Sequence, residues 1–185
     1  VPEAHYNQGN ALLALGRHGD ALASFDRAVD LKPDYAEAWS NRGTALLALE
    51  HFGEAQRSFD TLLVLRPNDA AAHYNRGVAL EALGHFDAAL ASYDRAIAFD
   101  PRNADAHLNR GVVLAALARN EDELASYDRA IALKPDHAEA WSNRGSSLFA
   151  LARVADALES CDRAIAIDPN HADARHNRSF CHLLA

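Results

Sequence analysis

The chain has 185 residues, a formal net charge of −8, 49% hydrophobic residues and only 8% aromatic residues. This acidic balance argues against nucleic acid and against an anionic membrane surface as partners. No apolar run approaches the roughly 18 residues that a membrane-spanning helix needs, and no signal peptide is visible.

Proline marks an internal repeat along the chain. Pro33, Pro67, Pro101, Pro135 and Pro169 are each 34 residues apart, and a period of this length is typical of repeat arrays. The spacing predicts five tandem units over residues 2–35, 36–69, 70–103, 104–137 and 138–171. Residues 172–185 then form the first helix of a truncated sixth unit. We expect one continuous array, excised from a longer protein because the chain lacks an initial Met and stops inside a unit.

The first half of each unit predicts a helix, here called helix A. With each Pro as position 32, position 4 is His or Trp, position 8 is Gly in all five units, and position 11 is Leu. The spacing i, i+4, i+7 places these residues on one face of a helix over roughly positions 1–14. Glycine inside a helix costs about 1 kcal/mol relative to Ala, so we expect another element to approach closely there.

The second half predicts helix B, over roughly positions 18–30. Position 20 is mostly Ala, position 24 is Phe, Tyr or Cys, and position 27 is Ala or Leu. Gly16 and Gly84 follow helix A, where a left-handed residue ends a helix, and the Pro ends helix B. Asp34, Asp136 and Asn170 are expected to cap the following helices A, with acidic residues three positions later as an approximate capping box.

The small and large residues at positions 4, 8, 11, 20, 24, 27 and 32 resemble the packing pattern of the tetratricopeptide repeat. The resemblance covers all residues except Val1. It implies an all-α, right-handed superhelical solenoid of antiparallel helix pairs, with helices A lining a concave groove. Glu123 departs from the pattern, because it stands where the other units have Ala. Asn120 also departs from it, and the fourth unit is therefore expected to be the loosest pair.

Asparagine at position 6 is the main candidate for binding in the groove. An α-helix rotates by about 100° per residue, which places positions 2, 5, 6, 9, 12 and 13 on the side opposite to the packing residues. A side-chain amide donates and accepts at once, as a peptide backbone does. A ladder along an extended peptide and a packing or capping role both remain open for these residues: Asn7, Asn41, Asn75, Asn109, Asn143 and Asn177.

Acidic residues recur at position 2, with Glu37, Asp105 and Glu139 as candidate groove residues that attract basic ligand side chains; a capping role is the alternative. Arginine recurs at position 7 and Asp at position 25. An arginine on the packing side needs an anionic partner, so we predict that these two positions pair from helix to helix.

The expected function is a protein–protein interaction scaffold that binds an extended peptide or protein segment. The asparagine row resembles the substrate-recognition arm of O-linked N-acetylglucosamine transferases, whose catalytic domain would lie outside this chain. Asn10 and Asn41 match two asparagines of the chaperone-binding carboxylate clamp, but the clamp's cationic residues are missing here, which argues against that ligand.

No catalytic constellation, cofactor site or metal site is predicted. His5, His73 and His107 occupy a packing position, and the cluster His171, His176, Cys181 and His182 lacks clean ligand spacing. Two cysteines favour a reducing compartment, the cytoplasm. Phe180, Leu183 and Leu184 lack a covering helix B, which predicts homo-oligomers through end-to-end packing.

Overall fold

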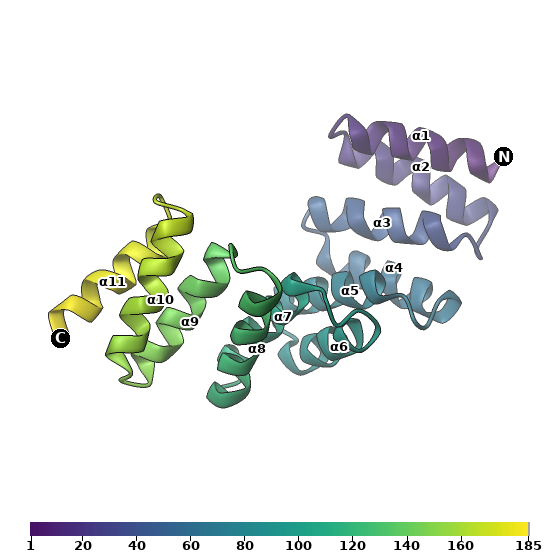
Figure 1. Cartoon of the computed structure of the whole chain (residues 1–185). Helices are drawn as coiled ribbons and strands as arrows, with labels where there is room; N and C mark the ends of the chain where they lie inside the picture. The colour runs from purple at the N-terminus through teal and green to yellow at the C-terminus, as the bar shows by residue number, and fades with distance from the viewer. Residues whose placement is uncertain (185) are drawn as a thin grey trace. The chain divides into compact units, whose positions relative to one another are not determined.

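The computed structural model describes residues 1–184, and the side chains of residues 1–183. This part of the chain contains α-helices and no strand (Figure 1). The helices are α1 (Pro2–Ala14), α2 (His18–Leu31), α3 (Ala36–Ala48), α4 (Phe52–Leu65), α5 (Ala70–Ala82), α6 (Phe86–Phe99), α7 (Ala104–Ala116), α8 (Asn120–Leu133), α9 (Ala138–Ala150), α10 (Val154–Ile167) and α11 (Ala172–Leu184).

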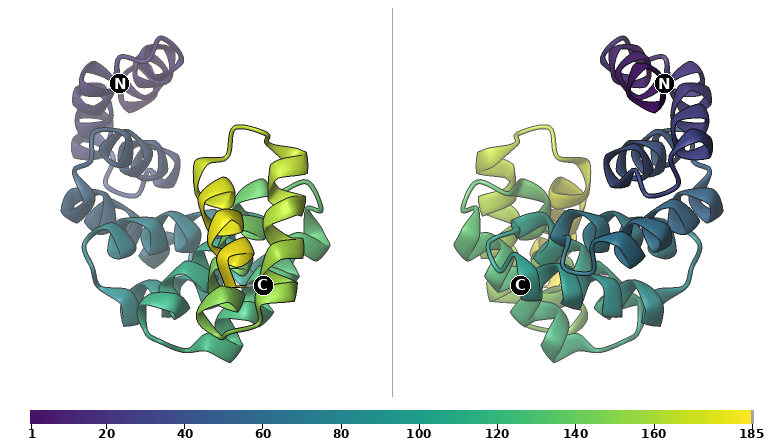
Figure 2. Two further views of the ribbon diagram at one scale, coloured as in Figure 1. Left: turned by 90° about the vertical axis from the view of Figure 1, so that its left-hand side faces the viewer. Right: turned by 90° about the vertical axis from the view of Figure 1, so that its right-hand side faces the viewer.

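Odd-numbered helices are the predicted helices A, and even-numbered helices are the predicted helices B. Each odd helix begins at position 1. The helices α1, α3, α5, α7 and α9 each lie beside the even helix that follows (Figure 2). The predicted bounds agree with the observed ones to within a residue or two. The helices form two compact units, Val1–Asp100 with α1–α6 and a second from Pro101 onward with α7–α11.

The turn between helices A and B contains a left-handed residue in every repeat. Gly16 and Gly84 have φ angles of 71° and 74°, which confirms the prediction made for them. Glu50, Ala118 and Ala152 occupy the same place with φ angles of 60°, 56° and 58°. The turn geometry is therefore kept even where a side chain makes it unfavourable.

Helix B ends just before the proline, as predicted. The residue that precedes each Pro is extended, with φ between −145° and −124°. The pyrrolidine ring disfavours helical geometry in the residue before it, so each B helix stops within one residue of this point.

The capping prediction was wrong by one residue. Helix A begins two residues after Asp34 and Asp136, so the N-caps are Tyr35 and His137, and neither side chain makes a capping hydrogen bond. Asp69 and Asn103 do cap helices A, since their side chains accept hydrogen bonds from the amides of Ala72 and Ala106 at 2.9 Å. Asn170 does not cap α11 either, because the amide of Ala174 donates to Nδ1 of His171 at 3.4 Å.

Glycine at position 8 makes room for the side chain at position 24. A Cβ atom added to Gly111 would lie 2.4 Å from the ring of Tyr127, and one added to Gly145 would lie 2.8 Å from Sγ of Cys161. The same contact joins Gly9, Gly43 and Gly77 to Phe25, Phe59 and Tyr93. The predicted close approach at this glycine is therefore confirmed.

The predicted arginine–aspartate pairs connect successive repeats. Arg42, Arg76, Arg144 and Arg178 contact Asp26, Asp60, Asp128 and Asp162 of the preceding helix B, at N–O distances of 2.7, 2.5, 2.6 and 3.3 Å. A serine at position 23 completes the contact. Ser58, Ser92, Ser126 and Ser160 each accept a hydrogen bond from the arginine of their own repeat at 2.6–2.8 Å.

Candidate functional site

Within each of the two units, the odd helices present a surface that we call the A face and define by positions 2, 5, 6, 9 and 12 of each repeat. Within the first unit α3 contacts both α1 and α5, and within the second α9 contacts both α7 and α11. Their side chains at these positions therefore lie side by side within each unit. The predicted site residues are all on this face.

Two of the asparagines join neighbouring odd helices. The amide nitrogen of Asn41 on α3 donates to Oδ1 of Asn10 on α1 at 2.6 Å. In the second unit, the amide of Asn177 on α11 donates to Oγ of Ser146 on α9 at 2.6 Å. In both cases position 6 contacts position 9 of the preceding odd helix. Part of their hydrogen-bonding capacity thus serves packing between repeats.

Three other asparagines keep their amides available. Within the described residues the side chains of Asn7, Asn75 and Asn143 have no hydrogen bond, and the last two are half-buried. At Asn143 the reason is local: the residue at position 9 of the preceding odd helix is Val112, whose side chain cannot accept. Asn109 is half-buried on α7.

The acidic residues at position 2 lie at the starts of the odd helices, where the helix dipole favours them. Glu37 pairs with Arg66, which follows helix B of the same repeat, and this hydrogen bond lowers the pKa of the Glu37 carboxyl. Asp105 lies 3.2 Å from Nε2 of His137. Glu139 is exposed. Two of these three predicted groove residues thus contact the loop that leads to the next odd helix.

A pocket in the second unit opens between α7, α8 and α9. It has a volume of about 200 Å³, and its lining residues are Val112, Ala115, Glu123, Tyr127, Asn143, Ser146 and Ser147. Glu123 and Tyr127 belong to α8. Val112 and Ala115 belong to α7, and Asn143, Ser146 and Ser147 belong to α9. The sequence marked Glu123 only as a departure from the repeat pattern and did not predict a pocket.

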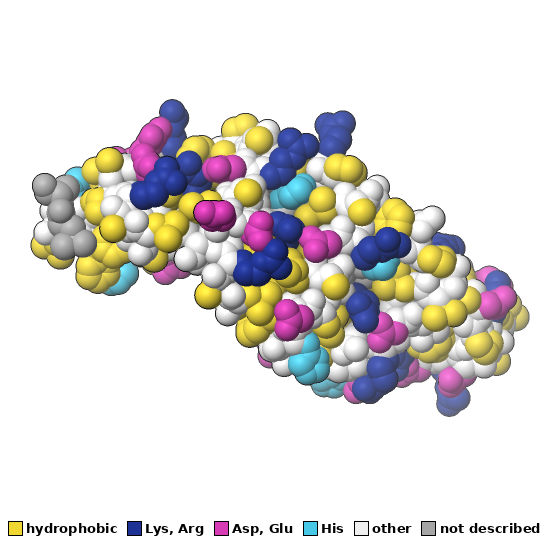
Figure 3. Space-filling view, turned by 90° about the horizontal axis from the view of Figure 1, so that it is seen from below, with side chains coloured by type: hydrophobic (Ala, Val, Ile, Leu, Met, Phe, Trp, Pro, Cys, Tyr) yellow, Lys and Arg dark blue, Asp and Glu magenta, His cyan; other side chains and the backbone are white. Residues whose placement is uncertain are grey.

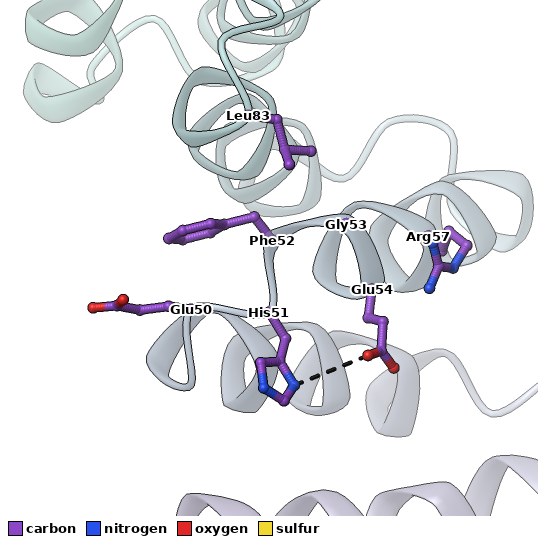
Figure 4. A pocket seen from close by; sticks show the side chains of 7 residues that line it. All are labelled: Glu50, His51, Phe52, Gly53, Glu54, Arg57 and Leu83. Carbon is purple, nitrogen blue, oxygen red and sulfur yellow. Dashed lines mark ion pairs between the residues drawn. The ribbon is translucent and has the colours of Figure 1, made fainter.

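A second pocket, of about 380 Å³, lies at the turn between α3 and α4. Figure 4 shows that His51 and Glu54 point toward one another, whereas Glu50 and Phe52 point to the opposite side from Arg57. Nδ1 of His51 is 3.9 Å from Oε1 of Glu54, and both side chains are about half exposed. Such a pair contributes little, and the pocket lies at helix ends, away from the A face.

The histidines at position 4 have a structural role. Nε2 of His73 and of His107 lies 2.9 and 3.3 Å from the carbonyl oxygens of Pro67 and Pro101. Trp39 and Trp141 donate from their indole nitrogens to the equivalent carbonyls at 2.8 and 3.0 Å. Burial lowers the pKa of His107. Among the described residues no group of three or more His, Cys, Asp and Glu side chains is placed to hold a metal ion.

Cys161 and Cys181 are free thiols, and both are buried. Burial raises the pKa of Cys161 to about 11 and also raises the pKa of Cys181. A thiol held in its protonated form is a weak nucleophile, so Cys161 acts as a small core side chain beside Gly145.

Charges are mixed on the molecular surface. Lys and Arg side chains are interspersed with Asp and Glu side chains over the face drawn in Figure 3. The residues that the structure describes form no helix with both the length and the hydropathy required to span a bilayer.

Comparison with known proteins assigns the repeat. A family model described as "Tetratricopeptide repeat" matches residues 40–104, 79–136 and 124–172, and one described as "TPR repeat" matches residues 9–50. No curated protein matches the chain at the sequence level.

Solved structures share the fold over nearly the whole chain. YrrB, described as a TPR protein with an unusual peptide-binding site, is 27% identical with a TM-score of 0.82, and the match covers 95% of this chain and 90% of that one. TTC0263, a TPR protein of Thermus thermophilus, is 27% identical with a TM-score of 0.72, and the match covers 99% and 100%. MamA of Desulfovibrio magneticus is 21% identical with a TM-score of 0.86, and the match covers 92% and 97%.

The family models cover well over half of the chain. The predicted fold class, an all-α solenoid of antiparallel helix pairs, is confirmed. The chain belongs to the tetratricopeptide repeat family.

Proposed function

We propose that this chain is a protein-interaction module that holds an extended peptide segment of its partner on the A face. The family fold supports a scaffold role in general, and the availability of the side-chain amides of Asn7, Asn75 and Asn143 carries the specific proposal. Each is on an odd helix, at the same position, and none makes a hydrogen bond within the described residues.

The spacing of the repeats suits a peptide in extended conformation. Packed helices lie about 8–10 Å apart, and an extended chain advances about 3.3 Å per residue. The unused amides of Asn7 and Asn75 are two repeats apart, so within the first unit they are separated by about 16–20 Å and meet about one backbone amide in every five or six. Because the peptide backbone is the same for every sequence, this mode of binding depends little on the ligand's side chains.

One comparison supports this mode of binding, and the cysteines bear on the compartment. YrrB, 27% identical, is described as having a peptide-binding site. The free, buried thiols of Cys161 and Cys181 support a reducing compartment such as the cytoplasm. The role is binding without catalysis, and the resemblance to the arm of a glycosyltransferase remains a prediction from the asparagine row.

A peptide-display selection with the 185-residue chain tests the proposal. The variant N7A/N75A/N143A removes three amides that make no hydrogen bond within the described residues, so it is expected to keep its melting temperature and to lose at least tenfold in affinity for selected peptides, about 1.4 kcal/mol. The matched control is N68A/N120A/N170A, because these asparagines are exposed and lie in the loops or at the start of α8. Unchanged affinity in the first variant would contradict the proposal.

The exposed side of α11 supports a second role, association of two copies of the chain. Phe180 is 42% exposed and Leu183 is 78% exposed, while the ring of Phe180 contacts His176 and Phe149. Light scattering over a concentration series checks this. Growth of the particle mass with concentration, and its loss in F180S/L183S, is the expected result, and a mass that stays monomeric throughout would exclude association.

A further inference from the structure

Glu123 occupies a position that the other repeats use for the core. Position 20 is Ala21, Ala55, Ala89 and Ala157 in those repeats, and each of these alanines is completely buried. Glu123 is itself only 5% exposed. A charged side chain has thus replaced a methyl group at a packing site, which costs stability unless the charge is compensated.

The protein compensates this carboxylate incompletely. The Ser147 hydroxyl on α9 contacts Oε1 of Glu123, but the same hydroxyl also lies 3.0 Å from the carbonyl oxygen of Asn143. A serine has one hydrogen to donate. Within the described residues Glu123 has no ion pair, and the nearby Arg119 pairs with Asp122 instead. Because no cation offsets the cost of burying the charge, burial raises the pKa of Glu123.

The carboxylate faces an open pocket rather than closed core. Glu123, Asn143, Ser146 and Ser147 line the pocket together with Val112 and others. Asn143 and Ser146 occupy positions 6 and 9, so the pocket opens on the A face beside one of the unused amides. At about 200 Å³ it is smaller than the roughly 300–1,000 Å³ of small-molecule sites, and it suits a single side chain.

We infer that this pocket binds an arginine or lysine side chain of the peptide held on the A face, with Glu123 as its counter-ion. The inference rests on the proposed function and names a specificity element within it. The Glu123 carboxylate and the Asn143 amide oxygen can both accept hydrogen bonds from a ligand, whereas the Ser146 hydroxyl already accepts one from Asn177 and donates one to Ser142. Guanidinium and ammonium groups are donors only, so they match this lining, whereas a carboxylate or phosphate would meet Glu123 as a like charge.

The inference also explains why a buried carboxylate is present at all. Interactions that cost stability are retained where binding needs them, and an arriving cation supplies the charge that the folded chain lacks. A charge-assisted hydrogen bond formed away from water is stronger than one on the surface. The asparagine supplies contact with any backbone, and Glu123 selects which residue is presented at this repeat.

Two pools of nonapeptides test the inference, with random neutral residues around a fixed central arginine or a fixed central citrulline. Citrulline has nearly the shape of arginine without its charge. Fluorescence anisotropy with the 185-residue chain is expected to give at least about tenfold tighter binding of the arginine pool. E123Q keeps the size and the acceptor of the side chain, and it is expected to remove this preference. E121Q is the matched control, because Glu121 is exposed on α8 outside the pocket, and it is expected to keep the preference.

The outcomes separate this inference from the proposed function. Equal binding of both pools, weakened by N7A/N75A/N143A, would leave peptide binding on the A face intact and overturn the cation site. An arginine preference that survives in E123Q would also overturn it, because another group would then select the charge. If neither pool binds, the proposed function and the cation site fail together.

Discussion

Arg42 of α3 reaches back to Asp26 of α2, with Nε 2.7 Å from Oδ1, and its Nη1 lies 2.7 Å from Oγ of Ser58 on α4. One guanidinium therefore joins two successive B helices while its side chain is only 17% exposed. The same arrangement recurs at Arg76 and Arg144. In a repeat array, contacts between neighbouring repeats determine how cooperatively the array unfolds.

Replacement of Arg42 by methionine is expected to destabilise the chain by about 2 kcal/mol, because charge-assisted hydrogen bonds are lost and Asp26 is left without its partner. Urea unfolding measures the change. Arg27→Met is the control, since Arg27 is exposed on α2 and makes no ion pair within the described residues. Equal stability of the two variants would show that the Arg42 contact contributes nothing to the stability of the array.

The left-handed turns predict three stabilising substitutions. Glu50, Ala118 and Ala152 adopt a φ that favours glycine, so Ala118→Gly and Ala152→Gly are each expected to raise the free energy of unfolding by about 1 kcal/mol, and Glu50→Gly by a similar amount. Gly16→Ala is the reverse control. Nothing lies within 4 Å of a Cβ built on Gly16, so its expected loss of about 1 kcal/mol is purely conformational. A gain in stability from Gly16→Ala would contradict this explanation.

Glu123→Ala restores the alanine that the other repeats have, and it is expected to raise stability at pH 7 by about 1 kcal/mol. The sign of the pH dependence follows from the raised pKa of Glu123. Folding favours the protonated carboxyl, so the unfavourable charge appears as the pH rises through the folded pKa. The gain from Glu123→Ala is therefore expected to shrink between pH 7 and pH 4. Thermal melts at both values check this, and a gain that grows on acidification would contradict it.

His107 gives a pH dependence of the opposite sign. Desolvation, with added effects of Arg129 and Arg110, lowers its pKa, so the folded chain favours the neutral ring. The stability that the neutral ring contributes is fully present above the pKa of histidine in the unfolded chain, about 6.5. It is lost as the pH falls through the lower pKa of His107 in the folded chain.

His107→Trp introduces the residue that Trp39 and Trp141 supply at the same position, with the same hydrogen bond to a proline carbonyl. The variant is expected to lose less stability than the parent chain between pH 7 and pH 5, as urea unfolding at both values measures. His107→Ala serves as the control that lacks the hydrogen bond. Parallel loss of stability in the parent and the Trp variant would exclude His107 as the titrating group.

The sequence was sufficient for much of this architecture because its signals are repeated. The glycine at position 8 and the aromatic residue at position 24 predict each other's contact, and Arg42 and Asp26 carry charges that need partners. The serine at position 23 was missed although it recurs in every repeat as Ser24, Ser58, Ser92, Ser126 and Ser160, and its repetition is the signal that could have identified it. The caps were misplaced at Asp34 and Asp136 because Asp is a favoured cap type, whereas helix A begins two residues later and leaves Tyr35 and His137 at the N-cap.

The candidate site was less predictable. Position 6 could be recognised from its repetition, but Asn41 and Asn177 turned out to contact the preceding odd helix, whereas Asn75 and Asn143 do not. At Asn143 the difference follows from Val112 at position 9 of the preceding odd helix, which cannot accept, but Asn75 faces Thr44 at that position and no residue type explains its unused amide. The pocket at Glu123 combines side chains from three helices, so no local pattern contains it.

Backbone methylation of the ligand tests the central claim most directly. A nonapeptide pool is compared with the same pool carrying N-methyl groups at alternate residues, which removes backbone donors and leaves the side chains unchanged. If the asparagine amides hold the peptide backbone, methylation lowers affinity for the parent chain at least tenfold and has little further effect on N7A/N75A/N143A. Equal binding of methylated and unmethylated pools by the parent chain would contradict the claim.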